Sequence, residues 1–138
     1  MIVLDENIFG QIVIDRLGVW YKGKLTSVNK LRADTVVKDD AIPTILRTVK
    51  QPTFLTTNIS DFWRKMPAHG AYCMICFDLS NEQIIEIPRL LRGVLRFKQF
   101  ETKASRMGKI LCVRHNHIDY YEVGSNQIFT LLWPLIIK

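Results

Sequence analysis

The acidic side chains that could support chemistry lie in three short segments of the sequence: Asp5 with Glu6, Asp39 with Asp40, and Asp61. Adjacent carboxylates repel one another, so both stay ionised only with a cation nearby or with thorough solvation. Carboxylate oxygens are the ligands that Mg²⁺ and Mn²⁺ prefer, and such an ion can activate a bound water for hydrolysis. These acids therefore predict metal-dependent hydrolytic chemistry, provided that the fold brings the three segments together.

Helix capping is the alternative interpretation of the same acids. Asp5 or Asn7 could cap a helix that follows the first apolar run, and Asp39 and Asp40 suit the first turn of a later helix. A cap accounts for one polar residue, whereas two adjacent carboxylates at the end of a strand need a further reason.

The segments around the acids predict an α/β fold that gathers them. The apolar run at residues 2–4 and the run at 53–57 are typical of buried strands in a parallel sheet. A helix is expected over residues 7–18, ending at Gly18, and a second from Asp39 to Arg47 with Pro43 in its opening turn. With right-handed crossovers, the carboxyl ends of such strands meet at one edge of the sheet, where ligands bind.

The remaining elements extend this pattern. Residues 24–28 and 71–77 predict strands, and residues 29–38 predict a solvated loop, with phosphate contact as its alternative role. Ser80 and Gln83 form a capping box for a helix that continues to Phe97 and restarts at Pro88. Strands at 109–114 and 118–123 predict a hairpin, and residues 124–138 form an apolar tail that completes the core or docks on a partner.

Cysteine and histidine residues give weaker indications. Cys73 and Cys76 have CxxC spacing, but on a strand they point to opposite faces, which disfavours a zinc or redox site. His115 and His117 could share one strand face and bind a metal, but no paired carboxylate is evident, which favours a turn.

Composition indicates one domain spanning residues 1–138, with 48% hydrophobic and 23% charged residues. The net charge of +6 favours a polyanionic partner, and the basic helix face that carries Arg92, Arg96 and Lys98 predicts contact with nucleic acid or an acidic protein. No apolar stretch is long enough to span a bilayer, and three cysteines suit a reducing compartment. We therefore expect a cytoplasmic protein without membrane contact.

Three motifs resemble the PIN-like nuclease domains. They are Leu4-Asp-Glu-Asn7, Asp39-Asp-Ala-Ile42 and Leu55-Thr-Thr-Asn-Ile-Ser-Asp-Phe62, and their order is similar to the branch that begins with an "LDEN" strand and supplies toxins of bacterial toxin–antitoxin pairs. The resemblance covers residues 2 to about 123. It implies a three-layer α/β/α sandwich with a mostly parallel central sheet and a C-terminal β-hairpin.

The resemblance also implies roles for individual residues. Asp5, Asp39 and Asp61 would hold Mg²⁺ or Mn²⁺, and Glu6 or Asp40 would orient water. Thr57 and Asn58 would position a carboxylate or a phosphate.

The chain departs from the branch at two positions. Ile59 stands where an acid is usual, with Asn58 as a partial substitute, and Lys30 lies near the place of a middle acid.

Three hypotheses follow. The first is a metal-dependent endoribonuclease, the toxin of a toxin–antitoxin pair, with RNA, an antitoxin protein and a second copy of the chain as partners. The second is a catalytically degenerate PIN-like module that binds RNA or protein, which Ile59 and the apolar tail favour. The third is an unrelated α/β domain whose acids only cap helices.

Overall fold

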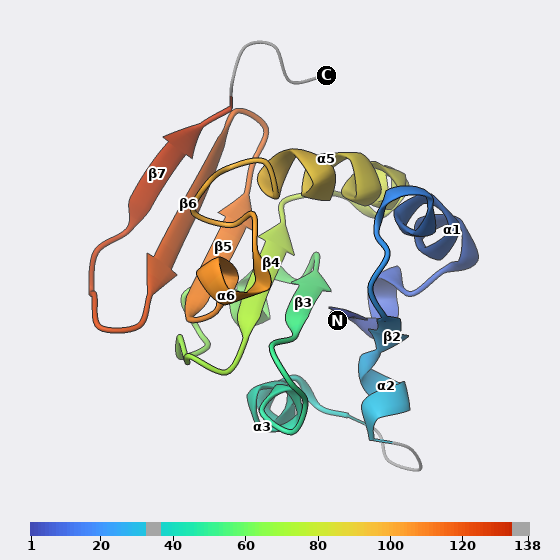
Figure 1. Ribbon diagram of the computed structural model, residues 1–138, viewed down its shortest axis with the longest axis horizontal. Coiled ribbons are helices and arrows are strands. Elements are labelled where there is room, and N and C mark those ends of the chain that lie inside the picture. Colours follow the sequence, from blue (N-terminus) through green and yellow to red (C-terminus); the bar gives the residue numbers. More distant parts are fainter. Residues whose placement is uncertain (33–36, 134–138) are drawn as a thin grey trace.

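The computed structural model describes residues 1–32 and 37–133, and these residues form one seven-stranded mixed sheet with helices packed against it (Figure 1). The strand order is β2-β1-β3-β4-β5-β6-β7. The first five strands in this order are parallel, and β6 and β7 are antiparallel to their neighbours. The predicted α/β class with a mostly parallel sheet is therefore confirmed.

The strands are β1 (Ile2–Leu4), β2 (Leu25–Ser27), β3 (Thr53–Thr56), β4 (Cys73–Phe77), β5 (Lys109–Val113), β6 (His117–Glu122) and β7 (Phe129–Leu132). The α-helices are α1 (Gln11–Trp20), α2 (Val28–Leu31), α3 (Ile42–Leu46), α4 (Ile59–Phe62), α5 (Ile87–Val94) and α6 (Lys103–Arg106). Three 3₁₀ helices complete the described elements: η1 (Glu6–Ile8), η2 (Asp39–Ala41) and η3 (Asn81–Glu86).

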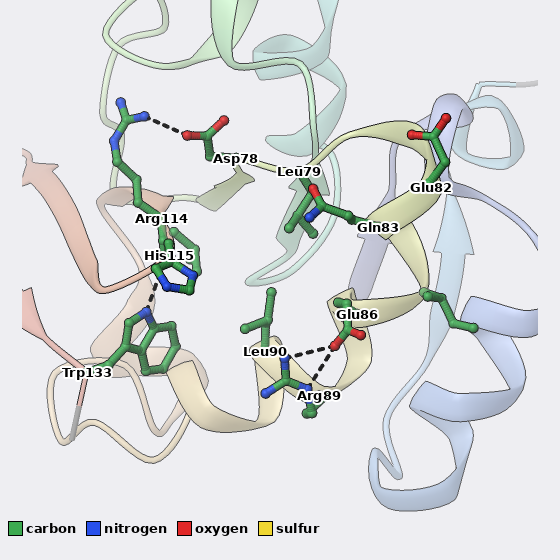
Figure 2. A pocket seen from close by; sticks show the side chains of 12 residues that line it. Asp78, Leu79, Glu82, Gln83, Glu86, Arg89, Leu90, Arg114, His115 and Trp133 are labelled. Atoms are coloured by element: carbon green, nitrogen blue, oxygen red, sulfur yellow. Dashed lines mark hydrogen bonds and ion pairs between the residues drawn. The ribbon is translucent and has the colours of Figure 1, made fainter. Parts of the chain in front are cut away.

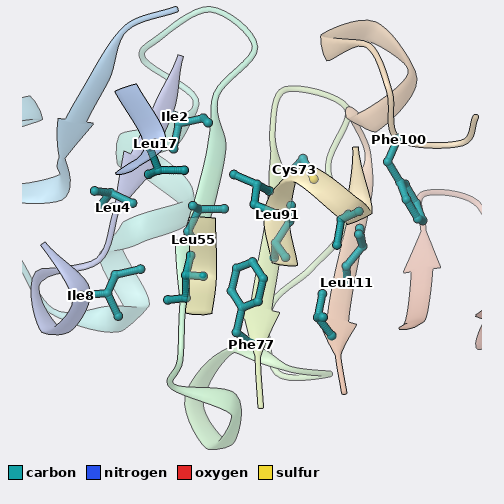
Figure 3. Close-up of a cluster of buried hydrophobic side chains, with 14 of the residues drawn as sticks. Ile2, Leu4, Ile8, Leu17, Leu55, Cys73, Phe77, Leu91, Phe100 and Leu111 are labelled. Carbon is teal, nitrogen blue, oxygen red and sulfur yellow. The ribbon is translucent and has the colours of Figure 1, made fainter. Parts of the chain in front are cut away.

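Alternate residues of the central strands enter two separate hydrophobic cores. Leu4 and Leu55 belong to the first core, which α1 and α5 cover through Leu17 and Leu91 (Figure 3). Val3 and Phe54 point the opposite way into the second core, which contains Ile42 from α3 and Phe62 from α4. Because successive side chains of a strand point to opposite faces, an apolar strand such as β1 supplies both cores.

Several helix boundaries follow from local sequence. Ser80 and Gln83 form the predicted capping box at the start of η3, and Pro88 lies in the first turn of α5, as Pro43 does in α3. The predicted stop at Gly18 is wrong, because Gly18 lies inside α1 and the helix continues to Trp20. Tyr21 ends it by adopting an extended backbone that leads toward β2.

The predicted loop at residues 29–38 is wrong in its first part. Residues 28–31 form α2, whose start is capped by the Ser27 hydroxyl accepting from the backbone N–H of Lys30. Residues 33–36 lie outside the described part of the chain.

The apolar tail enters the sheet in its described part. Residues 129–132 form β7 at the edge of the sheet, paired with β6, and Phe129 and Leu131 pack against the first core. This part of the tail therefore completes the core, while residues 134–138 lie outside the described range. Across residues 1–32 and 37–133, no helix is long and apolar enough to cross a membrane.

Candidate functional site

Asp5 is held at the carboxyl edge of the sheet by hydrogen bonds to both of its carboxylate oxygens. The backbone N–H of Glu6 donates to Oδ1 at 2.8 Å, and the Thr56 hydroxyl donates to Oδ2 at 2.6 Å. Only 9% of Asp5 is exposed. Thr56 ends β3, the strand beside β1, so the contact joins two neighbouring strand ends that are 51 residues apart in sequence.

Asp39 and Asp61 are joined by one amide group. Asn58 donates through Nδ2 to Asp39 Oδ2 at 3.1 Å and to Asp61 Oδ2 at 2.8 Å. Asn58 Oδ1 accepts from the backbone N–H of Asp61 at 3.2 Å and thereby caps α4. The amide therefore places partial positive charge between the two acids.

The pKa values of these carboxyl groups show that the acids affect one another. Burial, a hydrogen bond with Asp61 and the charges of Asp5, Asp61 and Asp40 together raise the pKa of Asp39 to about 6. Burial raises the pKa of Asp5 as well, against the hydrogen bonds from Thr56 and Glu6. The hydrogen bonds from Asn58 and with Asp39 lower the pKa of Asp61. Asp39 and Asp61 together thus retain a proton near neutral pH more readily than separate carboxyls would.

The position of these acids in the sheet is one that binds ligands in related architectures. The chain goes from β1 to β2 on one side, then crosses to β3 on the other side of β1, so the strand order reverses between β1 and β3. In open α/β sheets, ligands bind outside the carboxyl ends of the strands at such a reversal. Asp5 follows β1, and Asn58 and Asp61 follow β3, directly at this edge.

The donor atoms suit a hard divalent cation, although their spacing falls short of a formed site. Carboxylate and amide oxygens are ligands for Mg²⁺ or Mn²⁺. Among the described residues, however, no three acidic, histidine or cysteine side chains are close enough together to hold a metal ion. The Asn58 amide nitrogen lies between two of the acids, so a cation shared by Asp39 and Asp61 would have to replace its hydrogen bonds.

The other predicted catalytic residues lie around this group without joining it. Glu6 Oε1 accepts from the backbone N–H of Asn29 at 3.2 Å, and Asp40 is exposed beside Asp39. Thr57 accepts from Asn7 Nδ2 at 3.0 Å and, within residues 1–32 and 37–133, bonds no acidic side chain.

Thr56, and not the Thr57 that the PIN-like resemblance implied, donates a hydrogen bond to Asp5. Besides its bond to Asp5, the Thr56 hydroxyl accepts from the backbone N–H of Asn58 at 3.0 Å. Alternation along β3 could have identified it, because Thr56 and Phe54 share one face of the strand. The sequence alone did not define which threonine ends the strand.

Ile59 and Lys30 do not occupy acid positions in the site. Ile59 opens α4 and packs against the second core. Lys30 lies on α2 with its ammonium 4.8 Å from the centre of the Phe9 ring. The residue that stands beside Asp39 and Asp61 is Asn58.

The basic residues predicted for nucleic-acid contact lie away from the acids. Arg92 and Arg96 line a groove of about 500 Å³ between α1 and α5, together with Arg16 and Arg89. Lys98 is exposed and does not line the groove. This groove lies over the first core, whereas Asp5 and Thr56 are on the second-core face of their strands.

A second pocket of about 470 Å³ lies beside η3, between the ends of β4 and β5 (Figure 2). Its charged groups are largely paired, since Arg89 bonds Glu86 and Arg114 bonds Asp78. Neither pocket contains the acids, which sit on an open edge. The acids are the stronger candidate for a functional site, because their chemistry and mutual pKa effects indicate function better than cavity size does.

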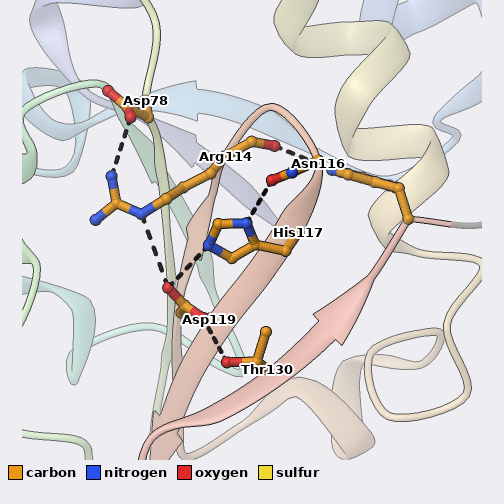
Figure 4. A network of polar contacts seen from close by, with 7 residues as sticks. Asp78, Arg114, Asn116, His117, Asp119 and Thr130 are labelled. Carbon is orange, nitrogen blue, oxygen red and sulfur yellow. Dashed lines mark hydrogen bonds and ion pairs between the residues drawn. The ribbon is translucent and has the colours of Figure 1, made fainter.

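His117 belongs to a surface network at the β5–β6 connection (Figure 4). His117 begins β6, with Nδ1 2.6 Å from Asn116 Oδ1 and Nε2 3.3 Å from Asp119 Oδ2. The expectation that no carboxylate pairs with these histidines is therefore wrong for His117. His115 lies in the connecting turn and lines the pocket beside η3.

The CxxC cysteines lie on opposite faces of β4, as predicted. Cys73 belongs to the first core and Cys76 to the second, and both are fully buried. Burial raises the pKa of Cys73 to about 12, so its thiol stays protonated at neutral pH. The two thiols serve as core residues.

Comparison with known proteins adds no family assignment: no protein family, no curated protein and no solved structure matches this chain at a significant level.

Proposed function

We propose that this protein is a metal-dependent endoribonuclease with a PIN-like α/β/α sandwich fold. The observation that carries the proposal is the convergence of Asp5, Asp39 and Asp61, from three separate segments, at the edge where the strand order reverses. Burial, a hydrogen bond with Asp61 and the charges of Asp5, Asp61 and Asp40 raise the pKa of Asp39 to about 6, so ionising Asp39 in the folded protein costs stability. Clustered carboxyl groups with pKa values shifted in this way are candidates for a functional site.

The roles of the residues follow from their positions. Asp5, Asp39 and Asp61 would hold Mg²⁺ or Mn²⁺, which supplies an activated water and stabilises charge on a phosphodiester oxygen. Thr56 orients Asp5 through its hydroxyl. Glu6 and Asp40, at the rim, would orient water and receive a proton from it.

The second candidate function is a PIN-like binding module that lacks catalysis. The Asn58 amide between Asp39 and Asp61 favours it, because this amide already satisfies the two acids without a cation. In that case the net charge of +6 would attract RNA or an acidic protein without any cleavage. If the nuclease of the first proposal is the toxin of a toxin–antitoxin pair, its protein partners would be an antitoxin and a second copy of the chain.

Cleavage of single-stranded RNA in the presence of Mn²⁺ tests the first proposal. We expect the wild-type protein to cut, and EDTA or Asp5→Asn to abolish cutting, because both remove metal binding. Glu101→Gln is the charge-matched control, since it also removes one negative charge, but from an exposed residue in a different part of the molecule. RNA binding should persist in Asp5→Asn.

Two results would count against the nuclease. Mn²⁺ titrations that are the same in wild type, Asp5→Asn and Asp39→Asn would show that these acids hold no metal. Salt-sensitive RNA binding without cleavage, across several RNAs and metals, would support the binding module instead.

A further inference from the structure

The groove between α1 and α5 combines four arginines with exposed apolar residues. Arg16 comes from α1, while Arg89 and Arg92 come from α5 and Arg96 from the residues just after it. The one acid among the lining residues, Glu86, is already paired with Arg89 at 2.8 Å. The groove therefore presents an excess of guanidinium groups.

Three of the four arginines form one row, and Arg16 lies on α1. Arg89, Arg92 and Arg96 are spaced three and four residues apart, so they follow one side of α5. The Arg92 guanidinium lies 5.9 Å from the centre of the Trp20 ring, and this cation–π contact turns it toward α1. Guanidinium groups bind carboxylates in a two-pronged geometry that a lysine cannot reproduce.

The α1 side of the groove adds apolar contacts. Val19, which lines the groove, is 74% exposed, and Ile12, which lies on α1 outside the groove lining, is 51% exposed. These two residues and Arg16 are spaced four and three apart, so they form a single stripe on α1. Single exposed apolar residues are ordinary, but a stripe beside a charged groove marks a contact surface.

We infer that this groove binds an acidic, amphipathic segment of a partner protein, with its apolar side on Val19 and Ile12 and its carboxylates on the arginine row. Charge complementarity selects an anionic occupant, and the apolar stripe selects a protein over RNA, because phosphates gain nothing from valine or isoleucine. The ten residues of α1 span about 15 Å, enough for two to three turns of a partner helix. This inference is independent of the nuclease proposal.

A synthetic peptide tests the inference on the full-length protein. The probe is a labelled helical peptide of about 15 residues, with Leu at helical spacing and Glu on the flanks. A scrambled peptide of the same composition and a single-stranded RNA serve as comparison ligands. Fluorescence anisotropy gives the affinities, and ¹H–¹⁵N spectra report the Trp20 indole N–H.

We expect the patterned peptide to bind and to shift the Trp20 signal, and the scrambled peptide to bind at least about fivefold more weakly. Arg92→Glu/Arg96→Glu should weaken binding by at least about tenfold. The control Lys50→Glu/Lys65→Glu carries the same charge change on exposed residues outside the groove and should change affinity less than about twofold. Val19→Ser should cost about threefold or more.

Val19→Ser keeps the test decisive if the charge reversals impair folding, because Val19 is exposed and Ser there removes no core contact. Asp5→Asn should bind the peptide like wild type, which separates this test from that of the nuclease. Equal affinity for both peptides, or no binding of either, would overturn the inference. RNA binding that depends on Arg92 and Arg96 but not on Val19 would also overturn it and assign the groove to nucleic acid.

Discussion

At the scale of single residues, Thr56 connects the parts of the acid group. Its hydroxyl donates to Asp5 and accepts from the backbone N–H of Asn58, so it fixes the first acid and the start of α4 at once. The hydroxyl of Thr57, the next residue, instead accepts a hydrogen bond from Asn7 Nδ2 at the surface.

Thr56→Val should therefore destabilise the protein by about 1–3 kcal/mol, because a buried carboxylate oxygen and a backbone N–H both lose their partner. If the acids bind Mn²⁺, affinity should also fall by about tenfold, as is usual when a residue that orients a metal ligand is lost. Thr57→Val is the matched control and should change either quantity little. Urea unfolding and Mn²⁺ titration measure both effects, and equal losses in the two variants would refute the role of Thr56.

Asp39 should make stability depend on pH. Its pKa of about 6 in the folded protein exceeds the ordinary value of 3.8, so the folded state binds this proton more tightly than the unfolded state. The contribution of Asp39 is therefore most favourable below about pH 4 and declines as pH rises toward 6. Asp39→Asn should remove that decline and be the more stable protein at pH 7, by less than about 1 kcal/mol because solvent screens the group.

Urea unfolding at pH 4 and pH 7 checks this expectation, with Asp40→Asn as the neighbouring control. An increase from pH 4 to pH 7 in the stability of the wild type relative to Asp39→Asn would contradict this expectation. Mn²⁺ should bind more weakly below pH 6 for the same reason, since the ion must displace the Asp39 proton.

At the scale of elements, the start of α4 decides which side chain meets the acids. Asn58 caps the helix and faces Asp39 and Asp61, while Ile59 turns into the second core. The resemblance to PIN-like domains implied that an acid is missing at Ile59. In the structure, an acid at this position would replace a core contact.

Ile59→Asp should therefore fail to create a metal ligand and should cost about 1–3 kcal/mol, because it places a charge against apolar side chains. Ile59→Val is the control for packing and should cost about 1 kcal/mol or less. Thermal unfolding measures both. A gain of Mn²⁺ affinity in Ile59→Asp would show that this assignment is wrong.

Asn58→Asp should behave differently, since Asp retains the helix cap but puts a third carboxylate beside Asp39 and Asp61. We expect lower stability without metal and recovery on adding Mn²⁺, measured by the shift in melting temperature. Asn58→Ser, which keeps the cap without the charge, should show no such recovery. A melting temperature in Asn58→Asp that does not respond to Mn²⁺ would speak against a metal at this position.

At the scale of the whole molecule, a buried cation fixes the chain after α5 to the sheet. Arg106 is 3% exposed; its Nε donates to Thr53 Oγ1 at 3.1 Å and one terminal nitrogen donates to the carbonyl of Phe100 at 2.9 Å. Arg106→Met should cost about 2–4 kcal/mol, because these buried acceptors lose their donor. Lys103→Met, an exposed change on the same helix, should cost little, and equal losses in urea unfolding would refute this role.

The sequence by itself determined the elements whose signals are local. The apolar runs of β1, β3 and β4, the capping box at Ser80 and the prolines that open α3 and α5 all lie where they were predicted, because strand burial and helix initiation depend on neighbours in the chain. The positions of Asp5 and Asp61 after two neighbouring parallel strands, β1 and β3, also followed from the predicted strand order.

Only the tertiary structure decided which side chains complete the site and the groove. Thr56 and Thr57 are adjacent in sequence, and the contact of the Thr56 hydroxyl with Asp5, 51 residues away in sequence, depends on the pairing of β1 with β3. The Asn58 amide lies between two acids, and Arg16 of α1 and Arg92 of α5 line one groove, although these segments are distant in sequence. Such contacts depend on how helices pack across the sheet, which the periodicity of one segment cannot specify.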